Sequence, residues 1–396
     1  MNILGITSNY YPELNAGVEI YVDGLSRKLS KRHKVMIFTR SKVVNKPCIE
    51  YNGHFHVFKI PRKNTKRDVK QYLKQCLIMF KPDIVHIHHL AGLGLQIPSL
   101  LLNLHIPYVI TLHDYWFLCG RIRLVNDSGD MCDGPGLKCV LCVAGKKLHK
   151  LPNALIEFLL RKTLYVRTLK SASVVLVSSN KMKERLVRVG LNQKNINLIK
   201  IGINKDAIKR VLTKEKNYRV FGFIGTISRF KGVHVLIKAF EGIESNSRLF
   251  LYGKPTGKER KFFQTLIEKN ERISFNGVFD HSEINSVLSE IDILVVPSIC
   301  GEAHCLVIDE ARAAGIPVIV SKIGAIPERI INEKNGFLIE PNNVDSLREK
   351  MQWLLDNYNS VKDILDYNFN LHTIEENTDI LIEIYRDTIK SNSFKS

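Results

Sequence analysis

The feature that most constrains the fold is an alternation of short apolar runs with helical patterns, which occurs twice along the chain. In the first half, amphipathic patterns at residues 18–32 and 68–80 predict helices. Apolar runs predict buried strands at 2–7, 35–40, 56–60, 83–89, 108–114 and 174–179. Strands that alternate with helices need crossover connections, so the pattern predicts a parallel sheet with helices on both faces.

The alternation restarts after a polar, lysine-rich stretch at about residues 205–217. Strands are then predicted at 219–226, 248–253, 272–277, 293–298 and 317–321, and helices at 232–243, 258–270, 282–291, 307–315 and 345–357. A chain of 396 residues is also too long for one ordinary core. We therefore expect an α/β protein with two Rossmann-like doubly wound domains, residues 1–205 and 206–374, that face each other across a cleft. The segment 375–396 is expected to form a helix that packs back across both domains.

No stretch of the sequence is predicted to cross a bilayer. The most apolar run, residues 97–112, contains two prolines, an Asn and a His, whereas a spanning helix needs ~20 nearly continuous apolar residues. The N-terminal MNILGITSNYYPE lacks a basic leader and a long apolar core, so it is interpreted as a strand and not as a signal peptide. These features predict a cytoplasmic protein.

The positive charge of the chain is confined to its first half. Residues 1–205 contain 33 Lys and Arg against 12 Asp and Glu, whereas the remaining residues contain 25 against 27. A one-sided excess of this size indicates an anionic partner, either nucleic acid or an anionic membrane surface. The basic residues are not interleaved with aromatic residues as in a recognised nucleic-acid-binding fold, which argues against nucleic acid.

The segment 297–330 carries the most chemical information. It follows a predicted strand and opens into a predicted helix, so it lies at the carboxyl end of a strand. The helix N-terminus near Cys305 and Leu306 offers unpaired backbone N–H groups and the positive end of the helix dipole, which suit a diphosphate. Glu302 in the loop can accept hydrogen bonds from sugar hydroxyls, and Glu310 inside the helix can do the same for a ribose.

This segment resembles the retaining nucleotide-sugar glycosyltransferases of family 4, also called group 1, which have the GT-B fold. The shared features are the two glutamates, the pattern E-A-x-A-x-G-x-P-V at 310–318, IGAIPE at 323–328 and NGFLIEP at 335–341. A loop glutamate or an alanine-rich helix alone occurs in many α/β proteins, but these features stand here together and in order. The resemblance covers nearly the whole chain.

The resemblance implies roles for further residues of the second half. Residues 224–240 look like the family's phosphate-binding turn, in which Lys231 would stabilise the leaving diphosphate. Thr226 stands at the usual arginine position, so Arg229 either supplies the second charge or is a solvated loop residue. Gly253 and Lys254, and the segment 274–284, match turns that approach the phosphates and the base. Many relatives have Phe-Gly where this chain has His304 and Cys305, a pair that we expect to influence the choice of sugar.

In the first half, residues 10–29 resemble the family's first loop and helix. Ala16 replaces the first glycine of Gly-Gly-x-Glu, whereas Gly17 and Glu19 are retained. Gly17 would let the backbone approach the diphosphate or the acceptor closely. By resemblance, His113 contacts the transferred sugar; the alternative is a capping or core histidine. His86 and His88 point to one face of a strand, where two imidazoles line a cleft more often than they bind a metal.

The chain contains eight cysteines, for which free thiols or a metal site fit better than disulfides in a long chain without an export signal. Four of them lie in or beside a Gly- and Asp-rich insertion, 119–142, and include one C-x-x-C: Cys119, Cys132, Cys139 and Cys142. They are expected either to hold a structural zinc or to remain free thiols. Some family members carry a similar cysteine-rich loop, which implies a structural role. No cofactor is expected for catalysis.

The resemblance implies hexosyl transfer, with retention, from a UDP- or GDP-sugar to a hydroxyl of a lipid-linked or polysaccharide acceptor. The acceptor would be a glycan or a polyprenyl-diphosphate-linked glycan, and the pathway that of a bacterial capsule, O-antigen or exopolysaccharide. A nucleotide-sugar epimerase or a phosphorylase on the same fold is the alternative, and a basic nucleic-acid-binding protein is a further one.

The predicted helix at 154–170 combines an apolar face with basic residues: Arg161, Lys162, Arg167 and Lys170. This mixture is typical of a helix that lies in a membrane interface. The alternative is an ordinary amphipathic helix packed on the sheet. Together with the positive charge of the first half, the pattern predicts peripheral association with the anionic inner face of the cell membrane.

Overall fold

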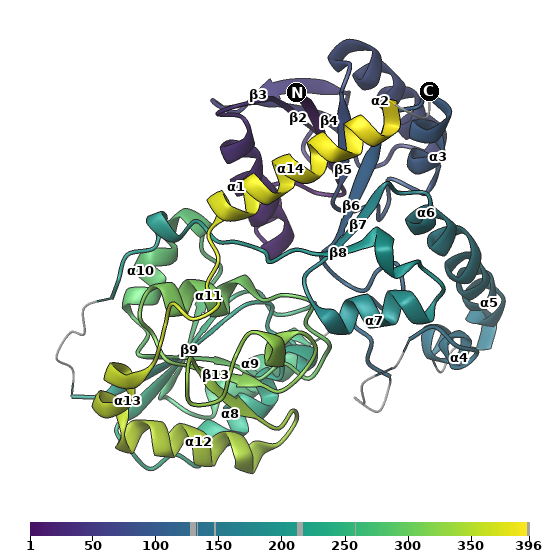
Figure 1. Ribbon diagram of the computed structural model, residues 1–396. Coiled ribbons are helices and arrows are strands. Elements are labelled where there is room, and N and C mark those ends of the chain that lie inside the picture. The colour runs from purple at the N-terminus through teal and green to yellow at the C-terminus, as the bar shows by residue number, and fades with distance from the viewer. Residues whose placement is uncertain (127–131, 133, 146–147, 212–216, 258, 394–396) are drawn as a thin grey trace. The chain divides into compact units, whose positions relative to one another are not determined.

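The computed structural model describes residues 1–126, 132, 134–145, 148–211, 217–257 and 259–393 (Figure 1). The chain divides into two compact units: Met1–Asp127, Cys132–Ile203 and His372–Ser396 form unit 1, and Asn204–Leu371 forms the described part of unit 2. The sequence placed these divisions after residues 205 and 374. Lys146 and Lys147 of the basic first half, and residues 212–216 of the lysine-rich stretch between the halves, lie outside the described residues.

Unit 1 is built on an eight-stranded sheet with the order β3-β4-β2-β1-β5-β6-β7-β8. Its strands are β1 (Asn2–Thr7), β2 (Lys34–Ser41), β3 (Cys48–Tyr51), β4 (His56–Pro61), β5 (Ile84–Ile87), β6 (Tyr108–Leu112), β7 (Val174–Val177) and β8 (Ile196–Leu198). Its helices are α1 (Gly17–Leu29), α2 (Lys66–Phe80), α3 (Gln96–Asn103), α4 (Lys138–Ala144), α5 (Leu151–Leu160), α6 (Val166–Lys170), α7 (Asn180–Arg188) and α14 (Ile374–Ser393). A π-helical turn, Arg161–Tyr165, joins α5 to α6.

The sheet of unit 1 departs from the all-parallel arrangement at one edge. β3 pairs antiparallel with β4, whereas all other neighbouring strands are parallel. The two strands form a hairpin around Asn52 and Gly53, and the Asn52 N–H donates to Phe55 O at 3.2 Å. Neither β3 nor β8 was predicted from the sequence. Asn-Gly between two strands is a strong hairpin signal, so β3 had a signal in the sequence.

Unit 2 is built on a six-stranded parallel sheet with the order β11-β10-β9-β12-β13-β14. Its strands are β9 (Arg219–Ile224), β10 (Ser247–Tyr252), β11 (Ile273–Gly277), β12 (Ile293–Val296), β13 (Val318–Ser321) and β14 (Phe337–Ile339). Its α-helices are α8 (Val233–Glu241), α9 (Arg260–Glu268), α10 (Ile284–Ser289), α11 (Leu306–Ala313), α12 (Val344–Asp356) and α13 (Tyr358–Ile364).

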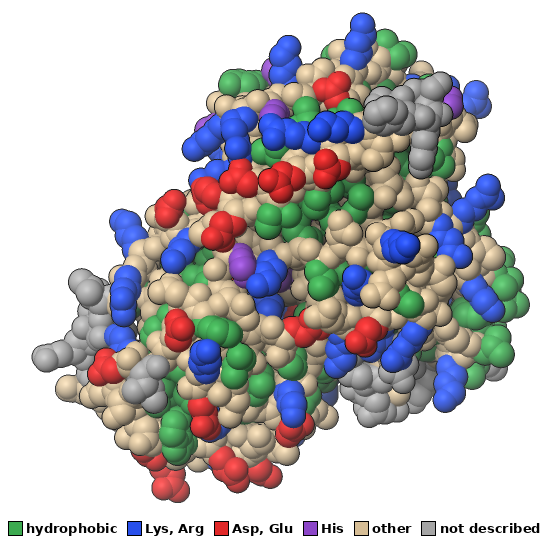
Figure 2. All heavy atoms as spheres, in the orientation of Figure 1, with side chains coloured by type: hydrophobic (Ala, Val, Ile, Leu, Met, Phe, Trp, Pro, Cys, Tyr) green, Lys and Arg blue, Asp and Glu red, His purple; other side chains and the backbone are tan. Residues whose placement is uncertain are grey.

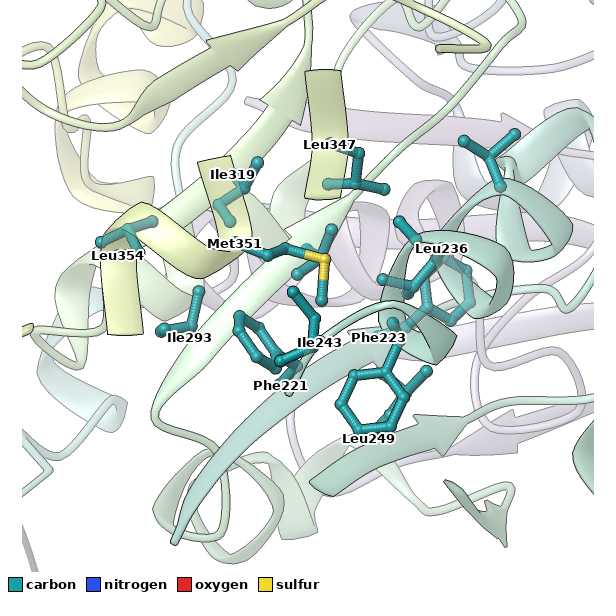
Figure 3. Packing of buried hydrophobic residues seen from close by; sticks show 14 of the residues in the cluster. Phe221, Phe223, Leu236, Ile243, Leu249, Ile293, Ile319, Leu347, Met351 and Leu354 are labelled. Atoms are coloured by element: carbon teal, nitrogen blue, oxygen red, sulfur yellow. The ribbon is translucent and has the colours of Figure 1, made fainter. Parts of the chain in front are cut away.

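The strands of unit 2 are apolar throughout because both faces of the sheet are covered. Alternate residues point to opposite faces, so Phe221 and Leu249 pack with α8 and α12 in one core cluster, shown in Figure 3. Leu294 and Val318 belong to a second cluster, with residues of α10 and α11. Each face is therefore sealed by helices, and the loops at the strand ends remain as places for a ligand.

The C-terminal helix α14 is part of unit 1 and packs on α1. The segment that leads into it is fixed by backbone bonds, in which the Ile203 N–H donates to His372 O at 3.0 Å and the Ile374 N–H to Ile203 O at 2.8 Å. Leu381 and Tyr385 are fully buried. Among the helices of the described residues, none is long and apolar enough to cross a membrane.

Candidate active site

The loops that follow β9 and β12 meet at the carboxyl end of the unit 2 sheet, because these two strands are neighbours. The Ile299 N–H donates to Phe230 O at 2.9 Å and so ties one loop to the other. Gly232 has φ +71°, and a Cβ there would overlap the Pro297 carbonyl oxygen. Only glycine allows this close approach, which brings the turn that bears Lys231 against the loop that bears Glu302.

Lys231 and Glu302 form an ion pair at this edge of the sheet. Lys231 Nζ lies 2.6 Å from Glu302 Oε1, and the Ser298 hydroxyl donates to the same oxygen at 2.6 Å. Glu302 is only 7% exposed. Burial of Lys231 opposes its charged form, but the Glu302 carboxylate outweighs this effect and raises the pKa of Lys231. The structure brings Lys231 and Glu302 together, and Ser298 is a partner that the sequence did not reveal.

The helix α11 begins four residues after Glu302, with Cys305 at the N-cap position. Burial, with the nearby Glu302 carboxylate, raises the pKa of the Cys305 thiol to about 12, so this thiol stays protonated. Burial, with the Arg329 guanidinium, lowers the pKa of His304 to about 4. His304 is therefore neutral near pH 7, and its Nε2 lies 3.5 Å from the Asp309 carboxylate.

Asp309 is the centre of a buried charge cluster behind this helix end. Its carboxylate pairs with Arg329 and, at 3.4 Å, with Arg312. Burial opposes the charge of Asp309, but the Arg329 guanidinium outweighs it and lowers the pKa of the carboxyl to about 2. Sequence reasoning did not single out Asp309 or Arg329, because each stands beside another charged residue, Glu310 or Glu328, in the sequence.

Glu310, the second expected glutamate, is buried in α11 and contacts a histidine of the 3-10 turn His281–Glu283. His281 Nε2 lies 2.7 Å from Glu310 Oε1. His281 belongs to the segment 274–284 that the resemblance placed near the base. The structure thus joins Glu310 to that segment, but through a residue that was not predicted individually.

The remaining expected donor-binding residues of unit 2 have separate surroundings. Arg229 is about half exposed; its backbone N–H donates to Glu259 at 3.3 Å, and its guanidinium lies 4.0 Å from the centroid of the Phe262 ring. Gly253 and Lys254 follow β10, the other neighbour of β9. Lys254 is exposed. The structure describes no bond between these residues and the Lys231–Glu302 pair.

In unit 1, His113 lies at the carboxyl end of β6 and forms part of a histidine cluster. His88 Nδ1 and His113 Nε2 are 3.1 Å apart. The His86 ring lies against the His88 ring with centroids 3.9 Å apart, and its two nitrogens bond to Tyr385 and Thr111 at 2.6 and 2.7 Å. Burial, with His113, lowers the pKa of His86 to about 3. The expected shared face of His86 and His88 is confirmed.

A second polar array lies at the same edge of unit 1 and was missed by sequence reasoning. His89 Nδ1 lies 2.8 Å from the Ser8 hydroxyl, and His89 Nε2 lies 3.2 Å from Asp114. The Ala91 backbone N–H also donates to Nδ1 at 3.1 Å, so Nε2 carries the proton that faces Asp114. The array joins the carboxyl ends of β1, β5 and β6.

The two retained residues of the Gly-Gly-x-Glu pattern, Gly17 and Glu19, lie in the first turn of α1. Gly17 is its exposed first residue, and Glu19 is buried. Burial raises the pKa of Glu19 to about 7, an effect that the neighbouring His89 reduces and Asp114 reinforces.

The predicted zinc ligands lie in the insertion that follows β6. Cys132 and Cys139 both have their sulfur near Gly134 O, at 3.5 and 3.9 Å. Within the described part of the chain, no group of three or more His, Cys, Asp and Glu is placed to hold a metal ion. This arrangement therefore does not itself supply the tetrahedral ligand set that structural zinc requires, and zinc stays a prediction.

Comparison with known families agrees with this geometry. A family model described as "Glycosyl transferases group 1" matches residues 204–370. A second, described as "Glycosyltransferase Family 4", matches residues 15–207. The chain belongs to glycosyltransferase family 4. This glycosyltransferase is thus an enzyme that transfers sugars, and the first family model contains the Lys231–Glu302 pair and α11.

Three curated relatives illustrate the range of the family. An uncharacterised glycosyltransferase of Methanocaldococcus jannaschii is 26% identical over 88% of this chain and 87% of its own length. Another from that organism is 33% identical, but over 38% of this chain and 42% of its own length. The lipopolysaccharide 1,2-N-acetylglucosaminetransferase of Salmonella typhimurium is 28% identical over 36% of this chain and 41% of its own length.

Solved structures confirm the fold of the glycosyltransferase. Sucrose-phosphate synthase of Thermosynechococcus elongatus has a TM-score of 0.77 at 20% identity, and 98% of this chain and 99% of that one are covered. The Anabaena protein HepE, solved with UDP and glucose, has a TM-score of 0.71 at 16% identity, with 97% and 99% covered. The predicted GT-B fold with two parallel-sheet α/β domains is therefore correct.

Proposed function

We propose that this glycosyltransferase moves a hexosyl group from a UDP- or GDP-sugar to a hydroxyl of a lipid-linked or polysaccharide acceptor, with retention at the anomeric carbon. The observation that carries the proposal is the ion pair of Lys231 and Glu302, 2.6 Å apart, with Glu302 in the loop that leads into α11. A cation, a carboxylate and the backbone amides at the start of a helix thus lie together at the carboxyl end of the sheet.

These groups match the needs of a departing nucleoside diphosphate beside a sugar. The raised pKa of Lys231 keeps its ammonium charged, so it can stabilise the negative charge that grows on the diphosphate. The backbone amides at the start of α11 add the positive end of the helix dipole. The buried Glu302 would accept hydrogen bonds from the sugar hydroxyls, and Glu310 from the ribose.

The relatives support the choice of donor and acceptor class. HepE is a structural neighbour that was solved with UDP and with UDP-glucose, and the Salmonella relative transfers N-acetylglucosamine to lipopolysaccharide, as its name states. We infer that this chain acts in the synthesis of a bacterial surface polysaccharide, such as a capsule, O-antigen or exopolysaccharide. It would work in the cytoplasm, in peripheral contact with the inner face of the membrane, where lipid-linked acceptors are held.

The decisive experiment compares Lys231→Gln and Glu302→Gln with the unchanged enzyme. Each substitution removes a group that faces the reacting sugar phosphate, so turnover should fall at least tenfold, or about 1.4 kcal/mol of transition-state stabilisation. The measurement is the release of nucleoside diphosphate in the presence of an acceptor glycan, with a donor first selected from a panel of nucleotide sugars by thermal shift.

Lys238→Gln is the matched control, because Lys238 is exposed on α8. It should leave turnover unchanged. Normal turnover in a folded Glu302→Gln protein would remove that carboxylate from the mechanism. Donor conversion at the same rate without any acceptor would instead indicate an epimerase, and dependence on inorganic phosphate would indicate a phosphorylase.

A further inference from the structure

Unit 1 carries an exposed apolar surface on α4, α5 and the turn after α5, and we propose that this surface inserts into the headgroup region of an anionic lipid bilayer. The inference rests on the proposed function and deepens it, because it assigns the contact surface for the membrane association named there. We define the α4–α5 leucine face by six residues: Leu137, Leu141, Leu155, Ile156, Leu159 and Leu164.

The helix α5 presents apolar side chains on the side that faces away from the protein. Ala154 and Phe158 are buried against unit 1, whereas Ile156 and Leu159 are 55% and 50% exposed. A surface helix that packs only on its own domain has polar residues on its outer face. The apolar outer face of α5 therefore needs a partner beyond unit 1.

The neighbouring helix α4 extends this surface. α4 and α5 lie side by side (Figure 1). Leu137, at the N-cap of α4, and Leu141 are four residues apart and thus on one helix face, and they are 79% and 66% exposed. Exposed leucines on two adjacent helices form a patch, which marks an interaction site more often than single exposed leucines do.

Basic side chains surround the leucine face. Lys138, Lys150, Lys162 and Arg167 are exposed. From residue 137 to residue 170 the sequence contains eight Lys and Arg but one acidic residue, Glu157, which pairs with Arg161 at 2.6 Å. Figure 2 shows hydrophobic and Lys or Arg side chains interleaved at this margin of unit 1. An interfacial helix combines leucines that enter the headgroup layer with flanking cations that attract anionic lipid.

The charge of the face favours lipid over a second copy of the chain. A symmetric dimer through this surface would bring the same basic residues of two copies together. Like charges that face each other across an interface oppose association. An anionic bilayer instead accommodates the leucines and neutralises the cations at once.

The test is flotation of the full-length enzyme with vesicles of phosphatidylcholine, either alone or mixed with phosphatidylglycerol. The unchanged enzyme should bind the anionic vesicles. A triple variant, Leu141→Gln with Ile156→Gln and Leu159→Gln, should lower the vesicle-bound fraction at least tenfold. Glutamine is a good helix former and the three positions are exposed, so the helices should persist.

The matched control replaces three equally exposed apolar residues elsewhere on unit 1: Ile78→Gln, Met79→Gln and Leu102→Gln, in α2 and α3. It should bind anionic vesicles like the unchanged enzyme. A further variant with Lys138, Lys150, Lys162 and Arg167 replaced by Gln should lose the preference for anionic over neutral vesicles.

Three outcomes would overturn the assignment. One is normal vesicle binding by the leucine-face variant, and a second is equal loss in the α2–α3 control. The third is a dimer that dissociates in the leucine-face variant while vesicle binding persists, which would identify a second copy as the partner. Turnover with a water-soluble acceptor tests the proposed function separately, because the leucine-face variant should retain it.

Discussion

Two buried carboxylates illustrate how single residues acquire different chemistry from their surroundings. Glu302 has the Lys231 ammonium 2.6 Å away, whereas the neighbours of Glu19 are the imidazole of His89 and the like-charged Asp114. Burial then dominates for Glu19 and raises its pKa from 4.5 to about 7. Glu19 therefore couples the stability of the enzyme to pH, since its carboxyl group holds a proton in the folded state that it loses in the unfolded state.

The Glu19→Gln variant should expose this coupling. Between pH 4.5 and 7 the folded state binds the extra proton, so the free energy of unfolding of the unchanged enzyme falls as pH rises through this window. The substitution removes that loss of unfolding free energy, which is roughly 3 kcal/mol for a rise of the Glu19 pKa from 4.5 to about 7. Denaturant unfolding at pH 5 and pH 7.5 measures it: the variant should gain stability relative to the unchanged enzyme at the higher pH. Parallel pH profiles would show that Glu19 does not titrate in this range.

At the scale of elements, the turns that leave the strands set the geometry of the candidate site. Gly253 follows β10 with φ +146°, and a Cβ there would overlap the carbonyl oxygen of Gly225, which follows β9. The two turns are therefore in backbone contact. Gly277 ends β11 with φ +76°, but a Cβ there would meet no atom within 4 Å.

These two glycines make a matched pair for mutation. Gly277→Ala should cost about 1–2 kcal/mol, because an alanine is strained at positive φ. Gly253→Ala adds overlap with backbone that has no room to move, so its cost should be larger by about 1–3 kcal/mol. The free energies of unfolding of the two variants give the comparison, and equal costs would show that the turns after β9 and β10 can separate without penalty.

At the scale of the whole molecule, the enzyme has two units that each contain their own sheet and buried residues. All expected donor-binding residues except Gly17 lie in unit 2, whereas His113 and α14 lie in unit 1. A ligand that binds unit 2 should therefore stabilise that unit selectively.

Calorimetry should resolve two unfolding transitions, and UDP should raise the midpoint temperature of one of them. At a UDP concentration of about 100 times its Kd the stabilisation is about 2.7 kcal/mol. Leu236→Ala, in the unit 2 core, identifies the transition that belongs to unit 2. It should lower the free energy of unfolding for that transition by about 2–5 kcal/mol. The Lys231→Gln variant should show a smaller UDP shift. A UDP shift confined to the other transition would place the nucleotide site in unit 1.

The sequence alone determined the elements, because hydrophobic periodicity is a local property that each segment carries in itself. It located most strands and helices, both sheets, and Lys231 and Glu302 at strand ends. Three edge strands, β3, β8 and β14, were missed, although Asn52 and Gly53 signalled the hairpin of β3.

Only the tertiary structure decided which side chains meet. Lys231 and Glu302 are 71 residues apart, and His86 and Tyr385 are 299 apart, so their contacts depend on strand order and on helix packing. For the same reason, the bond between Ser8 and His89 left no trace in local periodicity. The apolar face of 154–170 was visible in the sequence, but not which of its side chains face solvent. Partners across a sheet edge, and the side of a helix that stays uncovered, are properties of the assembled fold.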